Sequence, residues 1–303
     1  MIQTVLGKIN KEELGATLAH EHFIVDLDRV RKDGVSKIET IEEVIPEIEM
    51  MMEDGIKSAF EVTTNDMGRD VLKLKEISLK TGLNIVCSTG FYLSKYHPDW
   101  MDKASVEEVA EIFINDLTKG IDGSDIKAGL IGEVASSNTG FVGNELKVLK
   151  AAGLASVKTG SAIYTHTGKY AAKETVETLI NMGVNPDKII IGHQDLIDDT
   201  DYHLQILKNG VNVGFDTCGK SAYVPDEIRA KNILNLIENG YGDHIVLSND
   251  VSRRTYFTSY GHDGYLAVAR IVVPLLKEYG IKEEDLHKLL VTNPARIVDN
   301  DWE

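Results

Sequence analysis

Four histidines and one late aspartate are the residues whose types and spacing point most directly to chemistry. His20 and His22 are two positions apart, and His166, His193 and Asp250 follow singly along the chain. Residues two apart on an extended chain point to the same face, so the first two imidazoles can chelate one ion. Because imidazole and carboxylate are common ligands of transition metals, the pattern predicts a metal site.

Each of these residues also has an ordinary structural interpretation. A lone histidine at the end of a strand is more often a surface or capping residue than a ligand. Asp250 could simply cap the helix that follows it. Each of these residues closes a short apolar run. Separate structural roles for each residue would not explain why all of them share this position. The joint pattern therefore favours the metal site.

Glu133 is the candidate for a bridging ligand between two ions. Two divalent ions about 3.5–4 Å apart repel each other strongly unless an anionic group bridges them. Glu133 follows the apolar run 128–132 and offers one carboxylate oxygen to each ion. Together with Asp250 and one hydroxide it would leave two dications with a charge of about +1, which a buried site can accommodate. A salt bridge at the end of a strand is the alternative role.

Short β-rich runs that alternate with amphipathic helical stretches must position these residues. This alternation is typical of consecutive parallel βα units. The sequence predicts strands at 17–21, 58–63, 84–88, 128–131, 162–165, 188–191, 211–215 and 244–247. It predicts helices at 41–52, 71–79, 106–117, 145–157, 172–182, 202–207, 226–237 and 268–278.

Eight such units fill the chain without a linker, which predicts one (β/α)8 TIM barrel over residues 1–303. Residues 1–13 are expected to form a short N-terminal hairpin with a turn near Leu6-Gly7-Lys8. In such a barrel the carboxyl ends of all strands converge on one face, so ligands far apart in sequence can share a site. A doubly wound open sheet is the alternative, but no glycine-rich phosphate-binding motif follows the first strand.

The composition limits the class of partner. The 48 acidic residues exceed the 32 basic ones by 16, which argues against a nucleic-acid surface or an anionic membrane. No apolar run approaches the ~18 residues of a membrane span, and the N-terminus lacks the pattern of a signal peptide. Cys87 and Cys218 are expected to be reduced core residues. We therefore expect a soluble, cytoplasmic protein that acts on a small molecule.

The order of the candidate ligands resembles that of the phosphotriesterase family, part of the amidohydrolase superfamily, over essentially the whole chain. The segments ELGATLAHEH (13–22), GRD (68–70), STGFY (88–92), GHQD (192–195), SND (248–250) and TNPAR (292–296) carry the same resemblance. Founding members bridge their metals with a carbamylated lysine on strand four, whereas some homologous members use glutamate, as Glu133 would here. Lys127 lies too early in that strand to serve as the bridge.

The resemblance implies two divalent ions and a ligand set for each. One ion would be held by His20, His22, Glu133 and Asp250, and the other by Glu133, His166 and His193. Zinc is the default expectation, with manganese, cobalt or iron as alternatives. The resemblance further implies a hydroxide that bridges the metals and attacks an ester bond while Asp250 accepts and relays the proton. Because barrels of this family commonly form dimers, a homodimer is also expected.

The loops after strands three, seven and eight are expected to select the substrate. Tyr92 occupies the position where lactonase-like relatives have a tyrosine beside the metals, although a buried hydroxyl at the barrel rim explains it equally well. Lys220, Arg253 and Arg254, with Tyr256 nearby, stand out in an acidic chain and could bind a phosphate or carboxylate. Ordinary solvated loop charges are the alternative.

Three functions stay open on the sequence alone. The first is a binuclear-metal lactonase or carboxyl esterase, with a phosphorylated sugar lactone as the substrate that best matches the loop cations. The second is hydrolysis of phosphate triesters at the same site, which is less favoured because a neutral triester offers no anion to those cations. The third is a metal-binding protein without turnover.

Overall fold

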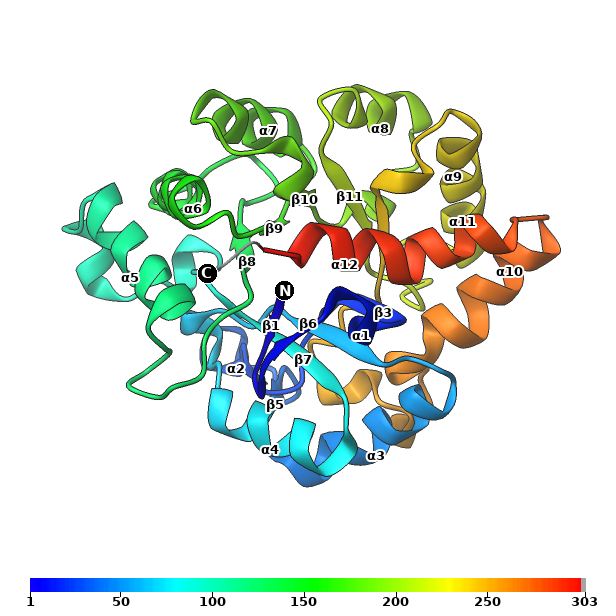
Figure 1. Cartoon of the computed structure of the whole chain (residues 1–303), viewed down its shortest axis with the longest axis horizontal. Helices are drawn as coiled ribbons and strands as arrows, with labels where there is room; N and C mark the ends of the chain where they lie inside the picture. The colour runs from blue at the N-terminus through cyan, green and yellow to red at the C-terminus, as the bar shows by residue number, and fades with distance from the viewer. Residues whose placement is uncertain (301–303) are drawn as a thin grey trace.

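Eight parallel strands form the centre of the computed structural model, which describes residues 1–300 (Figure 1). In chain order they are β3 (Thr17–Glu21), β6 (Ser58–Glu61), β7 (Asn84–Thr89), β8 (Leu130–Ala135), β9 (Ile163–His166), β10 (Ile189–Ile191), β11 (Asn212–Phe215) and β12 (Ile245–Leu247). Each strand pairs in parallel with the next one along the chain. The predicted (β/α)8 barrel is thereby confirmed.

Helices surround this barrel in the predicted order. They are α3 (Ile41–Glu53), α4 (Val71–Thr81), α5 (Val106–Thr118), α6 (Glu145–Thr159), α7 (Ala172–Asn181), α8 (Thr200–Leu207), α9 (Asp226–Glu238) and α10 (Val273–Glu278). The segment predicted as one helix over 268–278 is divided, since its first turn, Val268–Val272, is a π-helix. Helix α5 shows how local sequence sets a start, because Ser105 and Glu108 form a capping box there.

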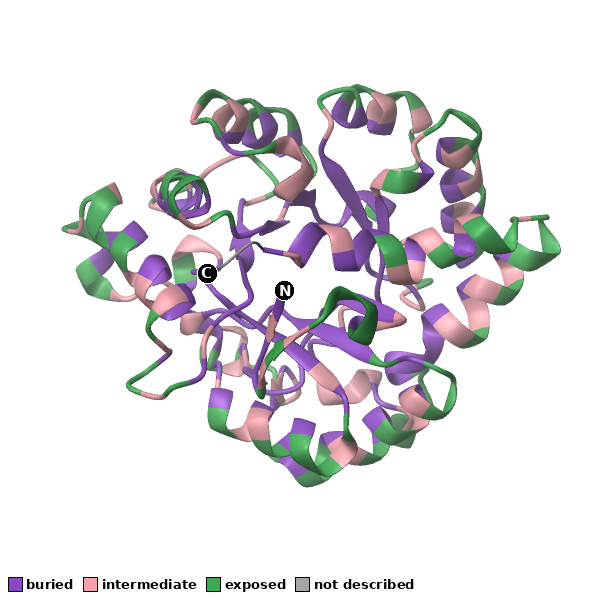
Figure 2. Cartoon of the chain, in the orientation of Figure 1, coloured by how far each residue is buried: buried purple, intermediate pink, exposed green. Residues whose placement is uncertain are grey.

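The helices bury one face each against the barrel, as the purple inner faces in Figure 2 show. Helix α3 buries Ile41, Val44, Ile48 and Met51, which recur at the spacing of one helix face. No helix in the described part of the chain combines the length and the apolar character that a membrane span requires.

No strand ladder joins β3 and β12 within residues 1–300. Side-chain hydrogen bonds and one backbone bond, from the Asp250 N–H to His20 O at 3.2 Å, close the barrel there. The fully buried carboxylate of Glu21 accepts hydrogen bonds from Ser248 Oγ at 2.8 Å, from the Asn249 backbone at 2.8 Å and from the Val251 backbone at 3.1 Å. Burial raises the pKa of Glu21 to about 7. One carboxylate thus connects the first strand of the barrel to the segment after the last.

The floor of the barrel is filled from both ends of the described chain. Strands β1 (Ile2–Thr4) and β2 (Gly7–Ile9) form an antiparallel hairpin, which α1 (Lys11–Leu14) follows. Helix α12 (Asn293–Val298) lies beside the N-terminus in Figure 1. Ile2 of the hairpin and Ile297 of α12 belong to one buried cluster with residues that point inside the barrel. The catalytic end of such a barrel is the opposite one, where the strands end.

Two differences from the predicted boundaries matter for the site. Strand β8 runs to Ala135, so Glu133 lies within the strand rather than beyond its end. The connection after β3 contains a small two-stranded unit, β4 (Val25–Asp26) and β5 (Lys37–Ile38), with the short helix α2 (Asp28–Arg31) between its strands. That unit brings an additional loop to the open end of the barrel.

Candidate metal centre

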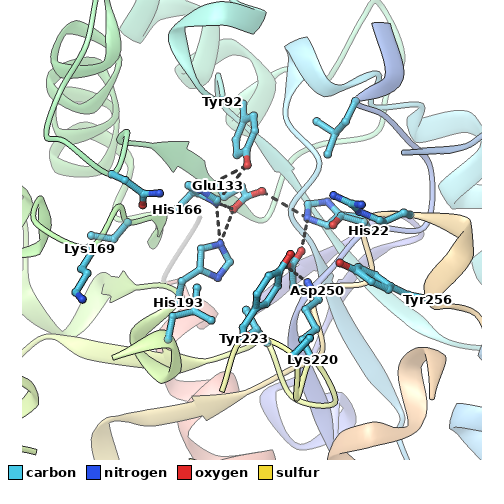
Figure 3. Close-up of a pocket in the computed structure, with 18 of the residues that line it drawn as sticks. His22, Tyr92, Glu133, His166, Lys169, His193, Lys220, Tyr223, Asp250 and Tyr256 are labelled. Atoms are coloured by element: carbon cyan, nitrogen blue, oxygen red, sulfur yellow. Dashed lines mark hydrogen bonds and ion pairs between the residues drawn. The ribbon is translucent and has the colours of Figure 1, made fainter. Parts of the chain in front are cut away.

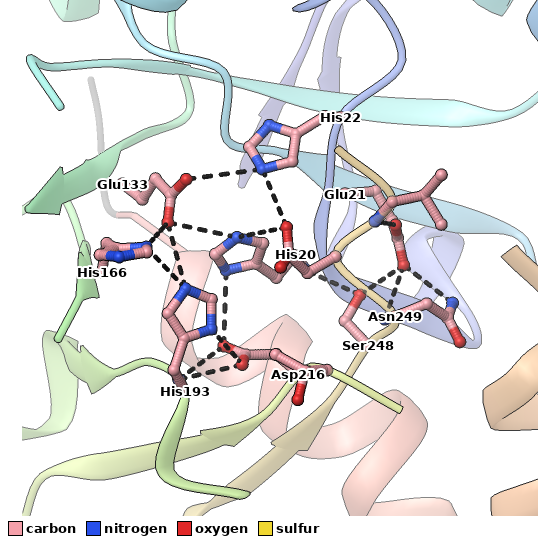
Figure 4. A network of polar contacts seen from close by, with 12 residues as sticks. His20, Glu21, His22, Glu133, His166, His193, Asp216, Ser248 and Asn249 are labelled. Carbon is pink, nitrogen blue, oxygen red and sulfur yellow. Dashed lines mark hydrogen bonds and ion pairs between the residues drawn. The ribbon is translucent and has the colours of Figure 1, made fainter. Parts of the chain in front are cut away.

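Six side chains converge at the carboxyl ends of five strands, and we call them the ligand cluster. Its members are His20, His22, Glu133, His166, His193 and Asp250 (Figures 3 and 4). They come from β3 and the residue after it, from β8 and β9, and from the segments that follow β10 and β12. All six residues predicted from the sequence as ligands are therefore neighbours in space.

Glu133 lies at the centre of the ligand cluster. Its Oε2 atom is 3.0 Å from His166 Nδ1, 3.4 Å from His20 Nε2 and 3.5 Å from His193 Nε2. Its Oε1 atom is 3.5 Å from His22 Nε2. The two carboxylate oxygens thus face different histidines, as a bridging group requires.

Asp250 completes the other side of the ligand cluster. Its Oδ1 atom is 3.4 Å from His22 Nε2 and 3.8 Å from His20 Nε2. Its Oδ2 atom forms an ion pair with Lys220 Nζ. One oxygen of this carboxylate therefore faces the imidazoles, and the other faces a cation of the surrounding cavity.

The donor atoms of the ligand cluster fit bound cations. Two groups, one of His20, Glu133 and His193 and one of His20, His22 and Asp250, each place their donor atoms within 4.8 Å of one another. Among the described residues, His20 Nε2 and His22 Nε2 are buried without a hydrogen-bond partner. Buried polar atoms are rarely left without partners, and a metal ion held by His20, His22 and Asp250 would satisfy both.

The electrostatics of the site keep its carboxylates ionised. Burial alone would raise the pKa of Glu133, but the adjacent His20 and His166 lower it below its ordinary value. Burial likewise opposes ionisation of Asp250, yet Lys220 and His22 hold the pKa of Asp250 well below its usual range. Both groups are therefore anionic at neutral pH, the form in which carboxylates bind metals.

Asp216, directly after β11, is a residue that the sequence analysis missed. Its buried carboxylate accepts hydrogen bonds from His193 Nδ1 at 2.8 Å and from the Tyr164 hydroxyl at 2.6 Å. One of its oxygens also lies 3.4 Å from His20 Nδ1 (Figure 4). An outer carboxylate of this kind orients the ring so that the opposite nitrogen faces the metal. Its position at the end of a predicted strand was the signal that could have identified it.

The backbone at two members of the cluster is in a conformation that non-glycine residues rarely adopt. His193 has a φ of 58° and Asp250 a φ of 51°, both in the left-handed region. Such conformations cost about 1–3 kcal/mol and persist where the surroundings fix them, often at active sites. The His193 backbone N–H donates to Asp216 Oδ1 at 2.9 Å, which is one contact that holds it there.

The ligand cluster opens into a cavity of about 640 Å³. Of the residues predicted to contact substrate, Tyr92, Lys220, Arg253 and Tyr256 line this cavity, whereas Arg254 is not among its lining residues. Figure 3 shows Lys169 and Tyr256 on opposite sides of the ligand cluster.

Arg31 and Lys169 also line the cavity, although the sequence analysis did not select them. We use the name cationic rim for Arg31, Lys169, Lys220 and Arg253. These four come from the loops after β3, β9, β11 and β12, so positive charge surrounds the opening on several sides.

The aromatic residues of the cavity contact both the rim and the cluster. Tyr256 lies beneath two cations, with Lys220 Nζ 5.0 Å and the Arg253 guanidinium 5.6 Å from its ring centre. The hydroxyl of Tyr92 is 3.4 Å from His166 Nδ1.

Arg254 directly follows Arg253 in the chain, and its backbone N–H donates to Val35 O at 3.2 Å. The neighbouring arginines 253 and 254 thus have different surroundings.

Comparison with known proteins places this architecture in a family. The model of the phosphotriesterase family matches residues 1–298. The chain belongs to the phosphotriesterase family. The resemblance predicted from the ligand order is thereby confirmed.

Individual members of the phosphotriesterase family align with nearly the whole chain. The phosphotriesterase homology protein of Escherichia coli is 32% identical over 283 residues, which cover 93% of this chain and 97% of that protein. The phospho-furanose lactonase of Mycoplasmopsis synoviae is 32% identical over 329 residues, which cover 98% of this chain and 91% of that protein. A crystal structure of a lactonase from Listeria monocytogenes superposes with a TM-score of 0.94 at 29% identity, covering 99% of each chain. The relatives with named activities are hydrolases, and this chain is a hydrolase of the same family.

Proposed function

We propose that this protein is a binuclear metal-dependent lactonase whose preferred substrate is a phosphorylated sugar lactone. The observation that carries the proposal is the position of Glu133 between two sets of histidines, beneath a cavity with a cationic rim. The lactonases among the similar proteins support the same reaction.

In this proposal the ligand cluster holds two ions. His20, His22 and Asp250 would hold one, His166 and His193 would hold the other, and the Glu133 carboxylate would be shared between them. Bound ions of this kind acidify water and polarise the carbonyl oxygen of an ester. Zinc is the proposed metal, since mixed nitrogen and oxygen ligands suit it.

Asp250 is the proposed acceptor of the proton that the attacking water loses. Its Oδ1 atom faces the imidazoles, and its pKa is held low, so it is ionised and available as a base before each turnover. Lys220 fixes the other oxygen of the same carboxylate. The proton can leave toward the cavity, because Asp250 is among the lining residues.

The cationic rim is the proposed binding site for an anionic part of the substrate. Its arginine and lysine side chains concentrate positive charge in a chain whose net charge is -16. Charge-assisted hydrogen bonds from such groups to a phosphate or carboxylate are about twice as strong as neutral ones. A phosphorylated lactone offers both an ester and such an anion, whereas a neutral phosphate triester offers the rim cations no anion.

The proposal is tested with one metal analysis and one set of substrates. The purified protein should contain two tightly bound ions per chain, and chelation should abolish hydrolysis. The kcat/KM for sugar lactones with a phosphate should exceed both that for the same lactones without it and that for a neutral aryl phosphate triester. A preference for the triester would replace this function with phosphotriester hydrolysis.

The remaining outcomes are equally decisive. Fewer than one bound ion per chain would overturn the binuclear model. A fully metal-loaded protein that hydrolyses neither lactones nor triesters would instead be a metal-binding protein without turnover.

Three further expectations stay predictions: a homodimer, a single domain over 1–303 and a cytoplasmic location. Analytical sedimentation tests whether the protein is a homodimer.

A further inference from the structure

A chain of buried polar groups runs from the ligand cluster into strand β6. His22 Nδ1 lies 2.9 Å from Thr63 Oγ1, and Thr63 Oγ1 lies 2.6 Å from Glu61 Oε1. His22, Thr63 and Glu61 all have no exposed surface. In such surroundings solvent does not compete with these hydrogen bonds, so their geometry governs the protonation of the ring.

The direction of the hydrogen bonds follows from the number of donors around Glu61. Its Oε1 atom also accepts the Phe23 backbone N–H at 3.1 Å, and its Oε2 atom accepts the Thr63 backbone N–H at 3.3 Å. The ionised form of Glu61, which predominates above pH 7, is thus an acceptor at both oxygens, and the single hydroxyl hydrogen of Thr63 points to it. A hydroxyl that donates its only hydrogen to Glu61 can only accept from His22.

This direction places the proton of the neutral His22 ring on Nδ1. The lone pair of the ring then lies on Nε2. Nε2 is the atom that faces Glu133 Oε1 at 3.5 Å and Asp250 Oδ1 at 3.4 Å. A lone pair that faces two carboxylates is unfavourable by itself and becomes favourable when a cation lies between them.

We propose that Glu61 and Thr63 are positioning residues that fix His22 as the Nδ1–H tautomer and so leave Nε2 free to bind a cation. The inference rests on the proposed metal-binding role of His22 and extends it to two residues that do not line the cavity. Thr63 acts directly on the ring, and Glu61 acts through Thr63.

The tautomer can be observed without any metal. Nitrogen NMR of the histidine rings in chelator-treated protein at pH 8, where Glu61 is mostly ionised, should show His22 protonated at Nδ1 in the wild type and in Thr63→Ser, which keeps the hydroxyl. Thr63→Val keeps the branched shape but removes the hydroxyl, and it should lose the uniform Nδ1–H form. A wild-type His22 protonated at Nε2 would overturn the proposal.

Zinc titration against a competing chelator measures the consequence for binding. Thr63→Val should weaken one of the two zinc sites by about 10- to 100-fold, the usual effect of removing an outer hydrogen bond to a ligand. Thr63→Ser should restore binding close to that of the wild type. Equal zinc affinities in Thr63→Val and the wild type would contradict the proposal.

Thr17→Val is the matched control for the loss of a buried hydroxyl. Thr17 lies at the other end of β3, where its hydroxyl donates to Gly15 O at 2.9 Å, and its replacement should leave zinc affinity unchanged. Melting temperatures of all variants separate lost binding from lost folding. If the wild type binds no zinc, the proposed function fails, whereas the NMR measurement still decides the tautomer of His22.

Discussion

The ligand cluster and the cationic rim lie side by side but are built in different ways. Four of the six cluster residues are buried, and β3, β8 and β9 carry half of them directly. The four rim residues are exposed or half-buried, and they come from the connections that follow β3, β9, β11 and β12, with Arg31 in the short helix α2. The difference indicates that the barrel fixes the reaction while the loops select the substrate.

The contacts around each region support this distinction. The Nδ1 atoms of His193 and His22 contact Asp216 and Thr63, respectively. These contacts restrict the rotation of both rings. In the rim, Arg253 contacts the ring of Tyr256, and its Nε atom has no hydrogen-bond partner among the described residues. Substitutions in the cluster should therefore change metal content and kcat, and substitutions in the rim should change KM.

The largest effect is expected from Glu133→Ala. Because both sets of histidines share this carboxylate, its removal should release both ions together and reduce kcat/KM by at least about a thousandfold, the scale of losing metal catalysis. Elemental analysis and steady-state kinetics on the same preparation measure the two effects. Retention of two ions per chain would move the bridge to another residue.

Asp216→Asn should have the next largest effect. An amide has one acceptor oxygen instead of two and carries no charge, so it cannot orient both rings, and zinc affinity should fall by about 10- to 100-fold. Tyr164→Phe is the graded control, because it removes only the hydroxyl that donates to Asp216 Oδ2 at 2.6 Å and leaves the ring contacts in place. Similar zinc affinities for Asp216→Asn and Tyr164→Phe would show that Asp216 does not orient the rings.

The neighbouring arginines provide a sharper test of the rim. Arg253→Ala should raise KM for a phosphorylated lactone by about tenfold or more, as expected for one lost charge-assisted hydrogen bond, with little change in kcat. Arg254→Ala should leave both constants unchanged, because Arg254 does not line the cavity. Equal effects of the two substitutions would mean that general charge, not position, attracts the substrate.

A smaller effect concerns the pH dependence of stability. Burial raises the pKa of Glu61 to about 7, so its contribution to stability is fully present below its unfolded pKa near 4.5 and is lost as pH rises through 7. The difference in unfolding free energy between the wild type and Glu61→Gln should therefore shrink by roughly 1–3 kcal/mol from pH 5 to pH 8. Urea unfolding of the metal-free proteins measures it.

Glu42→Gln is the control for this pH effect, because Glu42 is exposed on α3. Its difference from the wild type should stay constant over the same range. A difference for Glu61→Gln that grows with pH would mean that the folded state favours the ionised carboxylate.

The sequence predicted the barrel and the ligand cluster because both rest on strong local signals. Apolar runs marked the strands, and His20, Glu133 and Asp250 each stand at or near the end of one. Asp216 stands at such an end as well, but it has no partner in the sequence that would have singled it out. Thr63 and Glu61 alternate with apolar residues of the second strand. Polar side chains in such positions ordinarily face solvent or form hydrogen bonds within the core, so nothing in the pattern indicated a role at the metal site.

The rim was predicted less completely, for a physical reason. Arg31 lies in the added unit between β4 and β5, which no barrel pattern anticipates. Adjacent arginines on an irregular loop have no fixed periodicity, so nothing in the sequence distinguishes Arg253 from Arg254. Loop conformation depends on tertiary contacts, such as the bond from the Arg254 backbone to Val35.

The floor of the barrel has a consequence for biosynthesis. Ile2 and Ile297 pack in the same buried cluster, although almost 300 residues separate them in the chain. A ribosome must therefore release α12 before the hairpin that was made first can complete its contacts. Contacts at such long range form late and slowly. Until then, the first strands of each nascent molecule would expose their inward-facing apolar side chains, and such surface is prone to aggregation.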